Sequence, residues 1–529
     1  MAEDIIKTVT EGYAFDEPAV GVGALVNGDK AVPDAKVAIP LAMFNRHGLV
    51  AGATGTGKTV TLQVLAEQLA TQGVPVFLAD IKGDLSGMAT GGDGGEKLLK
   101  RTADIGQDWT PQAFPVEFYA LGGQGKGTPL RATMTAFGPT LLSKVLDLNE
   151  TQESSLGLIF HYADAQGLPL LDLKDLRAVV QHLISDEGKA ELKALGGLSA
   201  QTAGVILRAL INFADQGADK FFGEPEFDPA DLLHIGADGR GTVSILELPE
   251  LQAKPALFST FLMWLLAELF QGLPEVGDVE RPKLVFFFDE AHLVFSGSSK
   301  AFLTAITQTV RLIRSKGVGV FFVTQTPKDV PADVLAQLGA RVQHALRAFS
   351  PQDAKALKAA VTTFPHSAYD LEEDLTRLGI GEAMVTVLDD KGRPTPVAWT
   401  RMYAPRSRMG PSDEATMTGL IDGSAMKAKY GTDVDRDSAY EILARKVAAA
   451  AAAVPEPTAA TPGPPSVTKY EPIPSLDPAP TSRTAKKTKA AKQPASSPTG
   501  ILDTLAKSAA ATTFGREITR TLFGTAKRR

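Results

Sequence analysis

Eight consecutive residues, from position 52 to position 59, have the types and spacing needed to hold a chain of phosphates. Gly52, Gly57, Lys58 and Thr59 satisfy the pattern G-x-x-x-x-G-K-[ST]. Glycines allow a tight turn whose N–H groups point inward at an anion. The lysine supplies a cation for the β- and γ-phosphates, and the threonine hydroxyl is a ligand for Mg²⁺. The segment therefore predicts a site for ATP or a related nucleoside triphosphate together with Mg²⁺.

The residues on either side of this segment predict the elements that must position it. Residues 47–52 form a short apolar run typical of a strand, and residues 60–70 have apolar positions at helical spacing. Strand, loop and helix then follow in the order that places an anion at a helix N-terminus. The predicted nucleotide contacts are Gly52, Ala53, Thr54, Gly55, Thr56, Gly57, Lys58, Thr59 and Val60.

A pair of carboxylates, Asp289 and Glu290, follows a second apolar run at residues 284–288. Such a run is typical of a central strand buried on both faces. At its carboxyl end, Asp289 is placed to hold the Mg²⁺ of a bound nucleotide, so Thr59 and Asp289 are the predicted metal ligands. Glu290 is placed to orient and deprotonate an attacking water. The alternative is a pair of solvated carboxylates that merely ends a core strand.

Two further strands end in polar residues. Residues 318–323 lead to Thr324 and Gln325, and the amide of Gln325 is a candidate to sense the γ-phosphate or to hold the lytic water. The alternative is a cap at the strand end. Residues 74–80 end in Asp80, with Lys82 and Asp84 close behind, at the edge where ligands bind parallel sheets. Asp80 is therefore included among the predicted nucleotide contacts.

Arginines complete the set of candidate residues. A guanidinium from a neighbouring subunit can stabilise the charge that develops on the γ-phosphate. Arg314, just before the strand that leads to Gln325, and Arg347 are the candidates taken forward, and Arg46 and Arg311 lie at comparable places. Arginines at such places are more often solvated or paired at the surface.

Composition bounds the class of protein. The chain has 529 residues, 44% of them hydrophobic, and no cysteine, which excludes disulfides, zinc–thiolate sites and cysteine nucleophiles. The N-terminus lacks the pattern of a signal peptide, and the apolar run at 256–270 is short for a membrane span, so we expect a cytoplasmic protein. A net charge of −7 argues against a basic outer surface, although a channel can still concentrate positive charge on an inner face.

Changes in composition divide the chain. We expect a short β-rich segment at 1–45 and a P-loop ATPase domain at 46–447, with a mainly helical insertion at about 91–240. The Ala/Pro/Lys-rich stretch at 448–499 has the composition of a disordered linker. Residues 500–529 regain periodicity with interspersed Lys and Arg, which predicts a basic amphipathic helix that docks on a partner or packs on the protein itself.

Taken in order, the P-loop, Asp80-Ile-Lys-Gly-Asp84, Asp289-Glu290 and Thr324-Gln325 resemble the HerA/FtsK class of P-loop ATPases, and more closely the bacterial HerA-like proteins. The resemblance covers roughly residues 10–445. It implies an α/β RecA-like fold with an additional strand, ATP hydrolysis, and a homo-oligomeric ring, commonly a hexamer, that moves DNA through its pore. HerA proteins also carry an N-terminal β-barrel for a nuclease partner. Only about fifty residues precede the P-loop here, which argues against such a partner.

Three functions remain open at this point. The first is an ATP-driven DNA translocase or helicase. The second is an ATPase that moves or assembles proteins, as relatives in secretion and conjugation do. The third is a nucleotide-dependent switch of oligomerisation. A small-molecule kinase is disfavoured, because Glu290 beside Asp289 favours the activation of water.

Overall fold

The computed structural model describes residues 2–193, 196–252, 254–295, 300–348 and 350–452. Within them one twelve-stranded sheet has the order β2-β1-β12-β11-β10-β3-β9-β8-β4-β7-β5-β6. Its strands are β1 (Ala19–Asn27), β2 (Lys30–Pro40), β3 (Gly48–Ala51), β4 (Val76–Asp80), β5 (Val116–Leu121), β6 (Thr128–Leu130), β7 (Val243–Glu247), β8 (Leu284–Phe288), β9 (Val318–Thr324), β10 (Ala340–His344), β11 (Glu382–Thr386) and β12 (Ala398–Met402).

The strands from β10 to β6 are parallel and form the core of the sheet. Every residue of β3, β4, β8 and β9 is buried, as expected of parallel strands covered on both faces. Strand β9 lies between the P-loop strand β3 and strand β8, which precedes Asp289. This inserted strand is the additional strand of the predicted RecA-like class, so the predicted fold class is confirmed.

The other end of the sheet is antiparallel and is built from both ends of the described chain. β11 and β12 pair with each other, and β1 pairs with both β12 and β2. β1 and β2 lie within the segment predicted to be β-rich, 1–45, and they extend the main sheet. A helix that the sequence analysis did not predict, α1 (Ala2–Gly12), precedes them. The hydroxyl of Tyr13, just after it, donates hydrogen bonds to the carbonyls of Val385 and Pro396, both at 3.0 Å.

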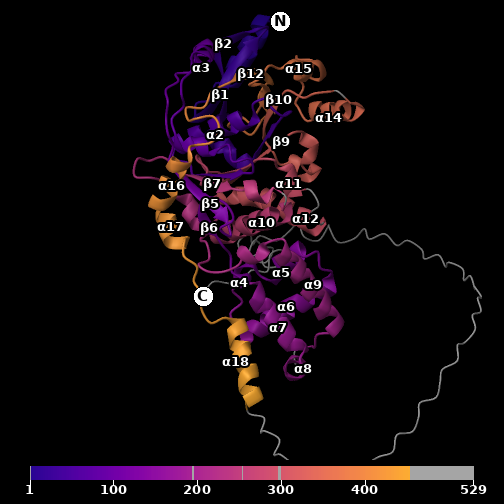
Figure 1. Cartoon of the computed structure of the whole chain (residues 1–529). Helices are drawn as coiled ribbons and strands as arrows, with labels where there is room; N and C mark the ends of the chain where they lie inside the picture. Colours follow the sequence, from indigo (N-terminus) through magenta and orange to yellow (C-terminus); the bar gives the residue numbers. More distant parts are fainter. Residues whose placement is uncertain (1, 194–195, 253, 296–299, 349, 453–529) are drawn as a thin grey trace, which may run out of the picture.

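Helices cover the sheet and form a separate group beneath it (Figure 1). The insertion predicted to be mainly helical, about 91–240, contains α3 to α9, whereas β5 and β6 within the same range belong to the main sheet. The apolar run at 256–270 forms most of a buried helix, α10. The helices up to this point are α2 (Lys58–Thr71), α3 (Glu96–Asp104), α4 (Met134–Phe137), α5 (Pro139–Val145), α6 (Glu150–Ala165), α7 (Leu173–Ile184), α8 (Asp186–Lys193), α9 (Ala200–Asp215) and α10 (Pro255–Gly272).

The remaining helices follow the Asp289–Glu290 pair. They are α11 (His292–Phe295), α12 (Lys300–Ile313), α13 (Ala332–Leu335), α14 (Pro351–Val361), α15 (Leu371–Arg377), α16 (Glu414–Gly423), α17 (Ala425–Tyr430) and α18 (Ala439–Ala452). Helix α18 lies beside α7, where the backbone N–H of Tyr440 donates to Asp175 Oδ1 at 2.9 Å. Because α18 continues to Ala452, the predicted linker boundary at 448 is wrong by at least one helical turn. The rest of that linker and the helix predicted at 500–529 lie outside the described residues.

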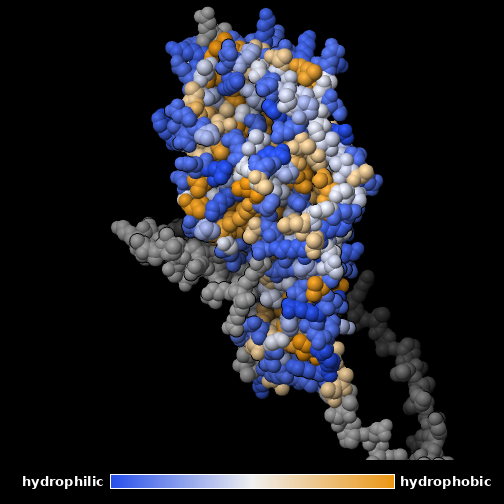
Figure 2. All heavy atoms as spheres, turned by 90° about the vertical axis from the view of Figure 1, so that its left-hand side faces the viewer, coloured by the Kyte–Doolittle hydropathy of each residue, from blue (hydrophilic) through white to orange (hydrophobic). Residues whose placement is uncertain are grey.

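The surface is mixed in character. Seen from the side that carries α16 and α17, hydrophobic residues form small groups among hydrophilic ones (Figure 2). Of the helices that the structure describes, none is both long enough and apolar enough to cross a membrane.

Candidate nucleotide site

The P-loop, residues 52–59, connects the end of β3 to the start of α2, as the sequence predicts. Gly57 precedes the helix with a φ of 115°, a left-handed conformation that favours glycine. At Gly52, whose φ is 157°, a Cβ atom would lie 2.5 Å from the Cβ of His344. Both glycines are therefore required by the shape of the turn, and the turn leaves its first helical N–H groups free for an anion.

The P-loop is supported from the side of β10 and β11. The amide of Ala53 donates to the carbonyl of Ala345 at 2.8 Å, and the amide of Gly381 donates to the carbonyl of Thr56 at 2.9 Å. These two contacts fix the loop at both sides of its turn. Neither supporting residue was predicted, because each is far from the P-loop in sequence and is brought there only by the strand order.

His344 is a further support that the sequence analysis missed. Its Nδ1 lies 2.9 Å from the carbonyl of Glu382, and its Nε2 lies 2.9 Å from the hydroxyl of Thr61. Because a carbonyl only accepts, Nδ1 carries the proton and Nε2 accepts from Thr61. Burial lowers the pKa of His344 to about 4, so the ring is neutral at pH 7 and adds no charge beneath the P-loop.

Lys58 folds back over the loop that it belongs to. Its Nζ donates to the carbonyls of Gly52 at 2.7 Å and Ala53 at 3.1 Å, and burial lowers its pKa. The amine is therefore held at the mouth of the turn by neutral partners, which phosphate oxygens can replace. Thr59 and Val60, in the first turn of α2, are partly exposed, and Thr54 and Gly55 are exposed.

Strand register brings the predicted catalytic residues to the same edge. Ala51 pairs with Thr324, Phe288 pairs with Phe322, and Ala79 pairs with Phe288. Asp80, Asp289, Glu290 and Gln325 are the residues at or just after these strand ends, and all of them lie on the P-loop side of the sheet. The structure thus brings the four together.

Asp289 is fully buried, and its Oδ1 accepts the backbone N–H of Glu290 at 2.9 Å. Glu290 has a φ of 47°, which is a left-handed and strained conformation for this residue type. Its side chain is 10% exposed. The backbone thus turns sharply after β8 and holds a nearly buried carboxylate in a conformation that a solvated strand end would not need.

Lys82 is the residue of this edge whose importance the sequence analysis underestimated. Its Nζ lies 2.7 Å from Glu290 Oε1 and 3.5 Å from Asp289 Oδ2. Burial works against its charge, but the carboxylates of Asp289 and Glu290 outweigh it, so the pKa of Lys82 is raised. The ammonium therefore remains charged and bridges the two carboxylates predicted to hold the metal and to activate water.

Asp80 has different partners from those predicted. Its carboxylate accepts the backbone N–H groups of Lys82 at 3.1 Å, Gly83 at 2.7 Å and Leu85 at 2.8 Å. These bonds shape the loop that presents Lys82. Burial raises the pKa of Asp80 to about 6. Its contact with a nucleotide stays a prediction, whereas its contacts within the loop are visible.

Gln325 follows β9 with its side chain exposed, while the Thr324 hydroxyl beside it donates to Asp329 Oδ2 at 2.9 Å. Arg347 is also exposed. It follows β10, so it lies at the same edge of the sheet as the P-loop. Arg314 precedes β9 and therefore lies at the opposite edge. The seven residues of β9 at ~3.3 Å each separate the two edges by roughly 20 Å.

Arginines converge at that opposite edge. A cavity of about 590 Å³ is lined by Arg46, Arg311, Arg314 and Arg341, among other residues. Arg314 and Arg46 both contact Asp278 Oδ1, at 3.0 and 3.3 Å. Arg314 was taken forward from the sequence and Arg46 and Arg311 were named beside it, but their convergence with Arg341 depends on the fold.

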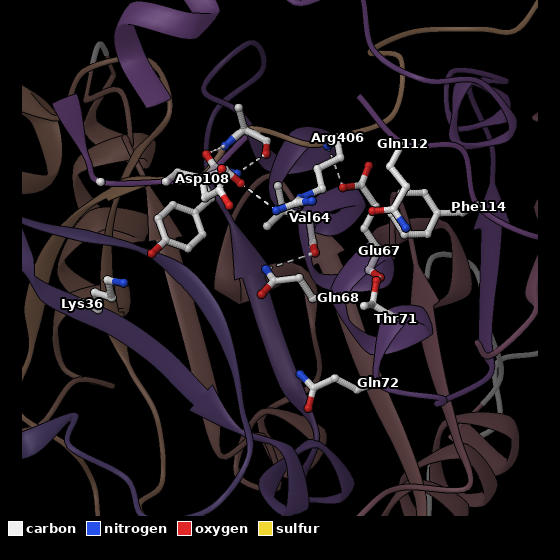
Figure 3. A pocket seen from close by; sticks show the side chains of 14 residues that line it. Lys36, Val64, Glu67, Gln68, Thr71, Gln72, Asp108, Gln112, Phe114 and Arg406 are labelled. Atoms are coloured by element: carbon white, nitrogen blue, oxygen red, sulfur yellow. Dashed lines mark hydrogen bonds between the residues drawn. The ribbon is translucent and has the colours of Figure 1, made fainter. Parts of the chain in front are cut away.

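A second concavity, of about 380 Å³, lies along the side of α2 (Figure 3). Its central carboxylate, Glu67, accepts the backbone N–H groups of Arg406 at 2.7 Å and Ser407 at 3.0 Å. Gln68 is likewise engaged with the backbone of Gly21. Because these polar groups satisfy one another, the concavity serves to fasten the segment after β12 onto the P-loop helix.

The P-loop edge fits a magnesium nucleotide. The ligand requires N–H groups at a helix N-terminus and a lysine for its phosphates, and both are present, with the lysine hydrogen-bonded to backbone carbonyls. It also requires oxygen ligands for Mg²⁺, and Thr59 and the buried Asp289 lie at the same edge of the sheet. No cluster of three or more histidines or carboxylates in the described part of the chain has the geometry to hold a metal ion unaided.

The strand order, the P-loop and the Asp-Glu pair after β8 define a P-loop ATPase of the additional-strand class. Within this class, the family model described as "Helicase HerA-like C-terminal" matches residues 27–529. The chain belongs to this family, which confirms the resemblance seen in the sequence.

Two curated relatives are helicases by name. The chain is similar to "Probable helicase MJECL08" of Methanocaldococcus jannaschii, with 24% identity over 359 residues that cover 65% of this chain and 64% of the relative. It is also similar to "DNA double-strand break repair helicase HerA" of Sulfurisphaera tokodaii, with 22% identity over 376 residues that cover 70% and 67%. The chain thus spans slightly less than two thirds of the length of the first relative.

Solved structures show more distant likeness. Plasmid coupling protein TrwB in complex with ADP and Mg²⁺ matches with a TM-score of 0.49 and 17% identity, over 75% of this chain and 98% of TrwB. VirB4 of Thermoanaerobacter pseudethanolicus matches with a TM-score of 0.44 and 16% identity, over 76% and 99%.

Proposed function

We propose that this protein hydrolyses ATP and couples hydrolysis to the movement or unwinding of DNA, acting in the cytoplasm as a homo-oligomeric, commonly hexameric, ring. The observation that carries the ATPase part is the common edge of β3, β9 and β8. There the P-loop, Gln325 and the Asp289–Glu290 pair lie next to one another, although they are far apart in sequence.

Each residue has a role that follows from its position. The P-loop N–H groups hold the β-phosphate, and Lys58 leaves its carbonyl partners for the β- and γ-phosphates. Thr59 and Asp289 would hold Mg²⁺, which neutralises charge on the phosphate oxygens. Glu290 accepts a proton from the attacking water, and Gln325 orients that water or senses the γ-phosphate.

Lys82 adds a condition to this scheme. While its ammonium lies 2.7 Å from Glu290 Oε1, that oxygen is engaged and is a poor acceptor for a water proton. Entry of the magnesium ion beside Asp289 would repel the ammonium and favour the γ-phosphate as its new partner. In this scheme Glu290 becomes available as a base only after Lys82 has moved away from it.

The DNA part is supported by membership in the helicase HerA-like family and by the names of the two helicase relatives. In a ring, Arg314, which lies roughly 20 Å from its own P-loop edge, would be available to the nucleotide of a neighbouring subunit. A nuclease partner is not part of this proposal.

Two substitutions test the ATPase site. Glu290→Gln should leave Mg·ATP binding within about twofold of wild type but reduce turnover by two orders of magnitude or more, because the amide cannot take the proton. Lys58→Ala should weaken binding itself by removing the cation that faces the phosphates. Calorimetric titration and phosphate release measure the two effects. Retained turnover in Glu290→Gln would show that another group is the base.

DNA dependence separates the three functions. For a DNA motor we expect single- or double-stranded DNA to raise the ATPase rate, and DNA affinity to fall steeply between about 50 and 200 mM salt. Mass measurement with ATP should show a ring. An ATPase unaffected by DNA would favour the movement of proteins instead, and an ATP-dependent mass change without steady turnover would favour an oligomerisation switch.

A further inference from the structure

The direction of the nucleotide across the P-loop follows from the site. The γ-phosphate must lie next to Glu290 and Gln325, which follow β8 and β9 on one side of β3. The P-loop wraps the β-phosphate between them and the rest of the nucleotide. The nucleoside of the bound nucleotide therefore extends to the other side of β3, over the ends of β10 and β11. This step rests on the proposed ATP site.

On that side, the turn before β11 is fastened directly to the P-loop. The Gly381 amide donates to the Thr56 carbonyl at 2.9 Å, and the Gly381 carbonyl accepts from the Arg101 guanidinium at 2.7 Å. The Gly379 amide donates to Glu382 Oε2 at 3.0 Å. The two neighbours of Ile380 are thus fixed by hydrogen bonds, and the backbone between them has little freedom.

This fixed turn presents an apolar side chain to solvent. Ile380 is 79% exposed, more than any other large hydrophobic side chain among the described residues. Gly381, with a φ of 74°, makes the sharp turn that points its neighbour outward. An isoleucine held in water beside a phosphate-binding loop is placed to contact an apolar group of a ligand bound at that loop.

We propose that Ile380 forms one face of a subsite for the nucleobase of the bound nucleotide. The flat face of a purine is the apolar part of ATP, and it would cover the isoleucine side chain and remove it from water. Arg347, exposed after β10 on the same side of the sheet, is placed to approach the base or the α-phosphate.

The test compares ADP with pyrophosphate, which has the same two phosphates and no base. In magnesium buffer, calorimetric titration of Ile380→Ser should show ADP binding weakened about tenfold, because burial of such a side chain is worth about 1.5 kcal/mol or more. Pyrophosphate affinity should be unchanged. Ile380→Leu, which keeps the apolar surface, should retain ADP affinity within about twofold.

Ile235→Ser is the matched control, since Ile235 is 44% exposed and precedes β7 at the opposite edge of the sheet. Unchanged ADP affinity in Ile380→Ser would overturn the subsite, and so would an equal loss for ADP and pyrophosphate, which would mean a damaged P-loop. A change of oligomeric mass without a change in ADP affinity would overturn it in favour of a subunit contact. If the wild-type protein binds neither ligand, the proposed ATP site itself fails.

Discussion

At the scale of single residues, the site is defined by competition between a few charges. Asp289 is buried and Glu290 nearly so, and Lys82 is the cation that contacts both. Two adjacent carboxylates without a cation would repel each other in a poorly solvated place. Lys82 therefore stabilises this pair of carboxylates, and under the proposed function it stands where magnesium and phosphate would compete for the same partners.

A neighbouring carboxylate, Glu247 at the end of β7, gives a pH dependence that can be measured. Burial and the charge of Asp80 raise the pKa of Glu247 from 4.5 to about 8. Between these values the folded chain holds a proton that the unfolded chain has lost. The free energy of unfolding should therefore fall as pH rises from about 4.5 to about 8, and it should level off above pH 8. The fall amounts to about 1.4 kcal/mol for each unit by which the pKa is displaced.

Glu247→Gln removes this titration and serves as the comparison. Chemical denaturation at pH 5, 6, 7 and 8 should show the variant gaining stability relative to wild type at each step upward. A stability difference that stays constant with pH would mean that Glu247 is already ionised in the folded protein at neutral pH.

At the scale of elements, the P-loop depends on the turn before β11. An alanine at Gly381 would need a left-handed conformation and would place its Cβ 2.7 Å from the Arg101 guanidinium. We expect Gly381→Ala to cost about 1 to 2 kcal/mol of stability and to weaken ATP binding severalfold, because the bond to Thr56 must shift.

Gly392→Ala separates the two effects. Gly392 has a φ of 73°, close to the 74° of Gly381, but nothing lies within 4 Å of the Cβ it would gain. The Gly392→Ala variant should lose stability because of backbone strain, which thermal denaturation measures. Its ATP affinity, measured by calorimetric titration, should be unchanged. Equal loss of ATP affinity in both variants would contradict a specific role for the turn.

The elements also show what sequence alone can predict. The P-loop, the strand before Asp289–Glu290 and the strand before Gln325 were found because each is a local pattern in one continuous segment. Lys82 stood in the sequence beside Asp80, but its partners lie more than two hundred residues away. His344 and Gly381 carried no local signal, because their role arises only where β10 and β11 meet the P-loop. Helix α1 was missed because its turns are rich in β-branched residues, which are weak helix formers.

At the scale of the whole molecule, the chain after β12 connects the sheet to the helical group. It contacts α2 through Glu67, then reaches Ser86, where the Ser412 hydroxyl donates to the Ser86 carbonyl at 2.8 Å, and ends in α18 beside α7. One continuous segment therefore joins the P-loop helix to the far end of the described structure.

The last prediction tests the proposed ring. Arg314 cannot reach the nucleotide of its own subunit, so Arg314→Ala and Lys58→Ala should each be nearly inactive alone but complement each other when mixed. A P-loop from the Arg314→Ala subunit then meets an intact arginine from the Lys58→Ala subunit. In a random one-to-one mixture roughly a quarter of the sites are complete, so phosphate release should recover to about that fraction of wild type. Arg311→Ala, in the same arginine-lined cavity, is the control that should remain active without mixing. If the mixture stays as inactive as its parts while still forming rings by mass, Arg314 does not act on a neighbour, and Arg46 or Arg341 becomes the residue to examine at that edge.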